Sequence, residues 1–180
     1  MSEFPWYTIV EGKLDLEQGD IIYKCPSLDL PQKEINTGSK IQVDVKQYDV
    51  VILSQSCDLV NAKINSVLLC PFAPLSYFQT QSDILKSSKG LKSLAEGNIT
   101  GYHPLNECKL KNYESEILVI DFHNVFTLPF AFIDSLAKKR ETRLRLLPPY
   151  REHLSQAFAR FIMRVGLPID IDLSKYKKEK

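Results

Sequence analysis

DVVILS, at residues 49–54, is the stretch of sequence that decides the fold. It has a counterpart in VLLCPF at residues 67–72. Both runs are apolar at nearly every position and rich in β-branched residues, which is typical of strands covered on both faces. The sequence therefore predicts that these two segments form the centre of a sheet.

Shorter strands are predicted before this centre. Residues 6–10 and 21–24 are aromatic or β-branched and are separated by turn residues, which indicates a first strand pair. Residues 25–40 contain Pro, Asn and Gly and are expected to form a polar loop. The alternating residues 41–45 predict a half-exposed strand.

The second half of the chain alternates short helices and strands. Residues 77–96 predict one or two short helices broken near residues 87–90, and residues 143–146 predict a last strand. Residues 116–121 and 125–128 predict two strands joined as a hairpin, because only three residues separate them.

The clearest helix follows Pro148 and Pro149. Its large apolar residues fall on one helical stripe, and Gly166 and Pro168 are expected to end it. The residues of this stripe are Tyr150, Leu154, Ala157, Phe158, Phe161, Ile162 and Val165. The basic residues 174–180 are expected to be a frayed tail.

The composition is that of a globular α+β protein with a β-rich core. The 180 residues are 44% hydrophobic and 25% charged, so we expect a single domain over residues 1–173. No secretory signal or membrane-spanning run is recognised, which predicts a cytoplasmic protein without membrane association. The cysteines, expected to be reduced and buried, are Cys25, Cys57, Cys70 and Cys108.

Charge is unevenly distributed along the chain. Residues 138–180 contain 12 Lys and Arg against 5 Asp and Glu, although the net charge of the whole chain is only +1. A basic half can form a nucleic-acid surface, but a solvated helix with a Lys-rich terminus produces the same excess, and we favour this second interpretation.

Residues 17–75 contain Gly19-Asp20-Ile21-Ile22, a long polar loop, an apolar strand that ends at Ser54, and a strand that contains Pro71. This order resembles the MazF/PemK toxin family. The resemblance implies a small SH3-like antiparallel β-barrel, here with helical insertions and a C-terminal amphipathic helix. It also implies an endoribonuclease that cleaves single-stranded RNA, usually as a homodimer held by an antitoxin.

The active residues of that family are missing from this chain. The positions of the family's catalytic Arg and following Pro are occupied by Tyr48 and Asp49. The Ser or Thr that follows the Pro-containing strand is replaced within residues 72–74. Because the Arg stabilises charge on the phosphorane, its loss should remove most of the activity. The resemblance therefore implies an inactive member, or one that uses other groups.

A second resemblance is to one particular group of MazF-like proteins with degenerate active sites. The chain is similar in size, and in its degenerate site, to the CalpT-type component of type III CRISPR-associated systems that contain a Lon protease and a sigma factor. This similarity rests on analogy with that group and not on a shared motif. It implies a partner protein that is antitoxin-like, protease-like or sigma-factor-like.

Residues 54–58 form the stretch with the most side chains that could act in catalysis. Cys57 could act as a nucleophile or Asp58 as a base, and with Tyr48 and Ser54 they form the candidate catalytic set. The alternative, which we favour, is a turn in which Ser and Asp side chains bond to backbone N–H groups beside a buried Cys.

Asp121 and His123 form a second candidate pair on the predicted hairpin. With His103 and Cys108 they could bind a metal, or with Cys57 they could form a catalytic pair. Their spacing matches no known zinc pattern, so turn and surface roles are favoured. We predict no metal and no cofactor.

Arginines supply a candidate RNA surface. Arg143, Arg145, Arg160 and Arg164 could contact phosphates. The alternative is that Arg143 and Arg145 form the solvent face of a strand and the helical arginines are solvated.

Two functions follow from the sequence. The first, which we favour, is a catalytically degenerate interaction module that binds or restrains a partner protein in a prokaryotic antiviral or stress-response system. The second is an active endoribonuclease with a rewired site.

Overall fold

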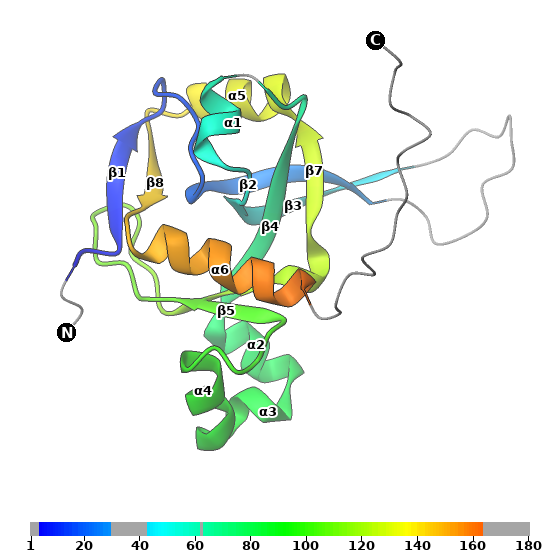
Figure 1. Ribbon diagram of the computed structural model, residues 1–180, viewed down its shortest axis with the longest axis vertical. Helices are drawn as coiled ribbons and strands as arrows, with labels where there is room; N and C mark the ends of the chain where they lie inside the picture. The colour runs from blue at the N-terminus through cyan, green and yellow to red at the C-terminus, as the bar shows by residue number, and fades with distance from the viewer. Residues whose placement is uncertain (1–3, 30–42, 62, 164–180) are drawn as a thin grey trace, which may run out of the picture.

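The chain folds into an eight-stranded antiparallel sheet with helices around it (Figure 1). This computed structural model describes residues 4–29, 43–61 and 63–163. The α+β class predicted from the sequence is confirmed. The strands are β1 (Tyr7–Glu11), β2 (Asp20–Asp29), β3 (Asp44–Ile52), β4 (Ser66–Pro74), β5 (Tyr102–Leu105), β6 (Leu118–Asp121), β7 (Phe126–Pro129) and β8 (Thr142–Leu146).

The helices lie between these strands and after the last of them. They are α1 (Ser56–Val60), α2 (Leu75–Gln81), α3 (Asp83–Lys86), α4 (Ser88–Ala95), α5 (Phe130–Lys138) and α6 (Tyr150–Ile162). A 3-10 helix, η1 (Phe122–Asn124), separates β6 from β7. None of the helices among the described residues combines the length and apolar character needed to cross a bilayer.

The strands follow the order β1-β8-β2-β3-β4-β6-β5, and β7 pairs with β4 beside this path. The sheet is open, because β1 and β5 are its end strands and no register joins them in the described part of the chain. Its closure into an SH3-like barrel stays a prediction. Arg164, residues 41 and 42, and the predicted tail lie outside the described residues.

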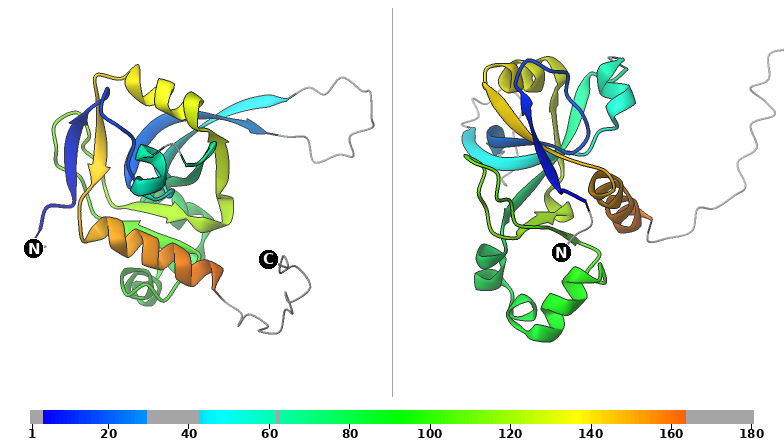
Figure 2. Two further views of the ribbon diagram at one scale, coloured as in Figure 1. Left: turned by 45° about the horizontal axis from the view of Figure 1, so that its top comes forward. Right: turned by 90° about the vertical axis from the view of Figure 1, so that its left-hand side faces the viewer.

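The predicted centre of the sheet is confirmed. Val50, Val51 and Ile52 of β3 are fully buried. Because successive side chains of a strand point to opposite faces, Val51 joins the core beneath α6, and its two neighbours join the core beneath α1 and α5. Figure 2 shows these helices on different sides of the sheet.

Strand β4 has two partners along one edge, which overturns the predicted hairpin. Its first half pairs with β7 and its second half, from Phe72, pairs with β6. β6 and β7 therefore lie end to end along β4 and do not pair with each other. Pro71 falls at the break between them, where it has no N–H to offer a neighbouring strand.

The predicted pairing of the first two strands is also wrong. β1 pairs with β8, and β2 pairs with β8 and β3. β2 also continues to Asp29, through residues predicted as loop. A bulge at Tyr23 and Lys24, where Lys24 has a φ of 49°, lets β2 bend and follow β3.

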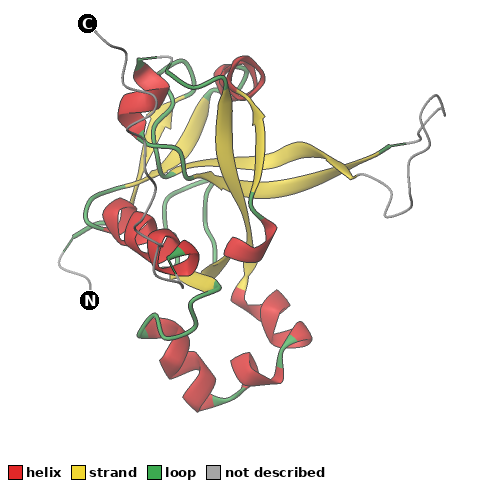
Figure 3. Ribbon diagram, turned by 45° about the vertical axis from the view of Figure 1, so that its right-hand side comes forward, coloured by secondary structure: helices red, strands yellow, loops and turns green. Residues whose placement is uncertain are grey.

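The helical predictions are confirmed in outline. Three short helices, α2 to α4, replace the predicted one or two and form a separate group against β6 (Figure 3). Helix α6 buries Tyr150, Leu154 and Ala157 against the sheet, as its apolar stripe predicted, but Ile162 at the end of the same stripe is 63% exposed. The ring of Tyr150 stacks on Trp6 with centroids 3.6 Å apart, which anchors the start of the chain.

A buried charge cluster joins β2 to β8. The Asp20 carboxylate accepts hydrogen bonds from Arg143 Nε at 2.8 Å and from Arg145 Nε at 2.5 Å. The remaining N–H groups of Arg143 donate to backbone carbonyls of residues 11, 12, 14 and 15. The side chains of Asp20 and Arg143 are both 0% exposed. The loop after β1 therefore closes over these charges.

The two arginines correct a prediction. Arg143 and Arg145 alternate with apolar residues, as in a strand with a solvated face, yet they are only 1% and 9% exposed. The strand β8 is buried on both faces, with apolar residues on one side and ion pairs on the other. These arginines are consequently not available to bind RNA at the surface.

We expect Val51→Asp to abolish folding, because a carboxylate there would be buried without a partner. The matched control is Val45→Asp on the same strand, where the side chain is 64% exposed and the variant should fold normally. Circular dichroism melts of both variants measure the difference. A sharp melt of Val51→Asp near that of the parent would contradict the burial of β3.

Asp20→Ala should lower the free energy of unfolding by about 3–5 kcal/mol, because it leaves two buried guanidinium groups without their carboxylate. Glu17→Ala is the control, since Glu17 contacts the outer Arg145 and is 33% exposed, and it should cost less than about 1 kcal/mol. Urea unfolding of the three proteins provides the comparison. Equal losses would mean that burial adds nothing to the Asp20 contacts.

Candidate functional site

The polar stretch after β3 is mainly structural. Ser54 Oγ accepts the N–H of Leu68 at 2.8 Å, and Ser56 Oγ accepts the N–H of Gln18 at 3.1 Å. Such hydrogen bonds from backbone N–H groups to the serines were predicted by the interpretation that we favoured, in which this stretch is a structural turn. The stretch itself is helical from Ser56, as α1, and the turn prediction is corrected in that respect.

Cys57 and Asp58 lie side by side on α1. The Cys57 thiol is exposed, whereas the sequence predicted it buried, because Leu59 is the residue of this helix that faces the core. Its Sγ lies 3.8 Å from Asp58 Oδ1. That neighbour is a carboxylate, which has the same sign of charge as a thiolate and not the positive charge that favours one. The other three cysteines are buried as predicted, and none of the four forms a disulfide.

Tyr48 lies away from the other candidate catalytic residues. It is on β3, four residues before Ile52, where the strand ends. Four residues of strand span about 13 Å, and Ser54 lies still further along the chain. The structure brings Ser54, Cys57 and Asp58 together at the end of β3 and leaves Tyr48 in a different place.

Arg160 is the remaining candidate arginine among the described residues. Arg160 is exposed on α6, and a Cβ added to Gly97 would lie 3.2 Å from its guanidinium group. The small recess that it lines includes Gly97 and His103 and not residues 54–58.

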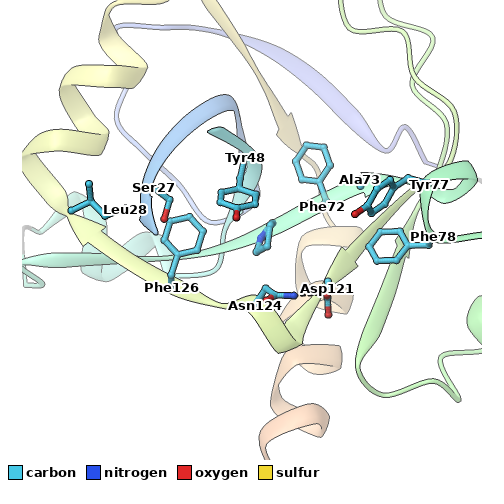
Figure 4. Close-up of a pocket in the computed structure, with 11 residues that line it drawn as sticks. Ser27, Leu28, Tyr48, Phe72, Ala73, Tyr77, Phe78, Asp121, Asn124 and Phe126 are labelled. Atoms are coloured by element: carbon cyan, nitrogen blue, oxygen red, sulfur yellow. Dashed lines mark hydrogen bonds between the residues drawn. The ribbon is translucent and has the colours of Figure 1, made fainter. Parts of the chain in front are cut away.

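A hollow of about 470 Å³ lies around Tyr48 (Figure 4). We call it the aromatic hollow, because its walls include Tyr48, Phe72, Tyr77, Phe78 and Phe126. They come from β3, β4, α2 and β7, so only the folded sheet assembles it. Ser27, Asp121 and Asn124 supply polar atoms on its lining.

Asp121 organises the polar side of the aromatic hollow. Its Oδ1 lies 2.7 Å from His123 Nδ1 and accepts the backbone N–H of His123 at 3.0 Å. Its Oδ2 accepts Asn124 Nδ2 at 2.6 Å. Asp121 therefore caps η1, as the predicted turn role implied, while its carboxylate adds negative charge to the hollow.

The other members of the proposed metal group are separated from this pair. Cys108 is buried beside Leu105 and Leu118, and His103 stacks against Phe122 with centroids 6.4 Å apart. Within residues 4–29, 43–61 and 63–163, no group of three or more His, Cys, Asp and Glu side chains is arranged to hold a metal ion.

A second hollow of about 430 Å³ lies beside the first and shares the side chain of Phe72. Its charged lining residues are Asp49, Glu114 and Arg140, so we call it the acidic hollow. Arg140 donates a hydrogen bond to the carbonyl of Tyr23. Two buried polar atoms on its lining, Arg140 Nε and Ser115 Oγ, have no hydrogen-bond partner in the described part of the chain.

Sequence reasoning found Tyr48 and Asp121 but missed the surface that they share. The aromatic residues that complete the hollow are scattered from Tyr48 to Phe126, and no local pattern links them. One signal was available: Pro71 and Pro74 interrupt an otherwise apolar strand, which marks places where its neighbours change.

A scan of the sequence against protein-family models finds no match, and a search of the curated proteins finds none. The function must therefore be inferred from the chemistry of the two hollows and of residues 54–58.

His103 makes the stability of the protein depend on pH. Burial, followed by the positive charge of His153 and Arg160, lowers the pKa of His103 from 6.5 to about 4. Between these values the unfolded chain binds a proton that the folded chain does not, so acidification favours unfolding.

We expect the free energy of unfolding to fall by at most about 3 kcal/mol through this residue between pH 6.5 and 4. Urea unfolding at several pH values measures it. His103→Phe keeps a ring against Phe122, and its free energy of unfolding should fall less steeply on acidification. The carboxylates titrate in both proteins, so their effects cancel when the two curves are compared. Parallel curves for the two proteins would refute the assignment.

Proposed function

We propose that this chain is a catalytically degenerate, MazF-like interaction module that binds or restrains a partner protein. The proposal includes the family resemblance, with the open sheet as a diverged form of the SH3-like barrel. It also includes a cytoplasmic location and a role in prokaryotic antiviral defence or stress response, of the CalpT type. Homodimer formation is compatible with this role and is not required by it.

The observation that carries the proposal is the burial of Arg143 and Arg145. A ribonuclease of this kind needs a cation at the scissile phosphate, where negative charge develops in the transition state. The strand arginines that the sequence offered for RNA are committed to Asp20. Both are closed off from solvent.

The geometry around α1 supports the same conclusion. Ser54 uses its hydroxyl to accept a backbone N–H, and Tyr48 lies in the middle of β3, four residues before the strand ends. Cys57 has a carboxylate as its side-chain neighbour. A nucleophile, a base and a cation are not brought together there, so the arrangement favours binding over catalysis.

The hollows also favour a protein over RNA as the ligand. The charged residues that line them are Asp49, Glu114 and Asp121 against Arg140 alone. This excess of negative charge repels a phosphate backbone, whereas aromatic walls with a polar rim are typical of protein-binding surfaces.

The test is incubation of the purified full chain with a mixture of single-stranded RNAs, with Asp58→Ala as the parallel control. We expect no cleavage by either protein above a buffer blank, because in the described part of the chain no cation lies beside Ser54, Cys57 and Asp58 to stabilise the transition state. Gel electrophoresis of the RNA measures the result. Multiple-turnover cleavage by the parent that the variant lacks would establish the rewired endoribonuclease instead.

A further inference from the structure

We propose that the partner contributes an extended segment that adds as a strand to the free edge of β3, between the aromatic hollow and the acidic hollow. This inference rests on the proposed function and assigns its binding surface. The occupant is a strand in which apolar side chains alternate with basic ones.

The two central strands separate to create this edge. β3 and β4 pair at Ile52, Val51 and Val50, and the last of these contacts is between Val50 and Pro71. Beyond that point β3 continues with β2 as a two-stranded ribbon, whereas β4 continues with β6. Figures 1 and 3 show the ribbon leaving the body of the sheet.

The direction of the free backbone groups follows from the hydrogen bonds nearby. Leu53 donates its N–H to Leu68 of β4. Because the N–H and C=O of alternate residues point to the same edge, those of Asp49, Gln47 and Val45 point to this side too. Their backbone groups on this edge have no hydrogen-bond partner among the described residues.

Strand β4 does not compete strongly for the same segment. By the same alternation, Phe72 and Pro74 face the gap, and Pro74 has no N–H to donate. The added strand would therefore form its backbone hydrogen bonds mainly with β3. Addition of a strand to an exposed edge takes its affinity from main-chain hydrogen bonds and its specificity from pockets for alternate side chains.

The hollows lie where those alternate side chains would point. Tyr48 lines the aromatic hollow, and the next residue, Asp49, lines the acidic hollow. Successive residues of a strand point to opposite faces, so the hollows are on opposite faces of β3. A strand added beside β3 would place every second side chain in each of them.

The charge of the acidic hollow indicates which side chains the added strand has on that face. The acidic hollow has two carboxylates, Asp49 and Glu114, against Arg140, which favours Lys or Arg on that face. The aromatic hollow favours large apolar groups on the other face.

The test is calorimetric titration of the full chain with a capped seven-residue peptide in which lysine alternates with phenylalanine and valine. We expect saturable binding of this probe. Gln47→Pro should weaken binding about tenfold or more, because it removes a free donor and obstructs the edge without removing a bond to β2. Gln47→Ala retains the N–H and should bind as the parent does.

Two further probes separate the possible ligands. The same peptide with N-methyl groups on alternate amides keeps its side chains but cannot form the ladder, and it should not bind. A seven-nucleotide uridine oligomer at low salt should neither bind nor displace the peptide. Displacement by the oligomer would overturn the inference and identify the surface as an RNA site.

Failure of this inference is distinguishable from failure of the proposed function. No binding of the peptide, or equal binding by the parent and Gln47→Pro, would overturn strand addition. Neither result would alter an absence of RNA cleavage, on which the proposed function is tested.

Discussion

The ion pairs of Asp20 with Arg143 and Arg145 constrain the rest of the structure. They lie where β2 meets β8, and Arg143 also binds the carbonyls of the loop after β1. A buried guanidinium group is tolerated only when its donors are satisfied, so strand, loop and neighbour must adopt one mutual arrangement. This arrangement holds the early strands β1 and β2 against the last strand, β8. It also gives Arg143 and Arg145 a structural role.

The fork between β3 and β4 is the second determinant. Along one edge β4 pairs with β7 and then with β6, and along its other edge it pairs with β3 only from Leu69 to Pro71. The sheet therefore divides at Val50 and Pro71, and the aromatic and acidic hollows open on either side of the division. Pro74 makes this division compatible with the hydrogen bonding of β4, because it faces the gap and lacks the donor that a continuous neighbour would use. On the other edge, Pro71 lies at the break between β7 and β6.

The two hollows are formed by other residues than the polar stretch 54–58, which the sequence indicated as a candidate catalytic site. Residues 54–58 bond mainly to the backbone that supports them, whereas the aromatic hollow collects aromatic rings and a carboxylate from four different strands and a helix. Exposed aromatic walls and an unpaired edge are suited to recognition of an extended chain. The molecule thus resembles a scaffold whose binding face is created by strand divergence.

The sequence by itself determined the buried strands around Val51 and Cys70, the short helices and α6, because hydrophobic periodicity is local. It also marked Asp121 and the serines of residues 54–58 as turn formers. Only the tertiary structure decided that Arg143 is buried, that β6 and β7 share β4, and that Tyr48 joins Phe126 in one hollow. Each of these depends on which distant segment covers a residue, and alternation along a strand cannot distinguish solvent from a covering loop with complementary charge.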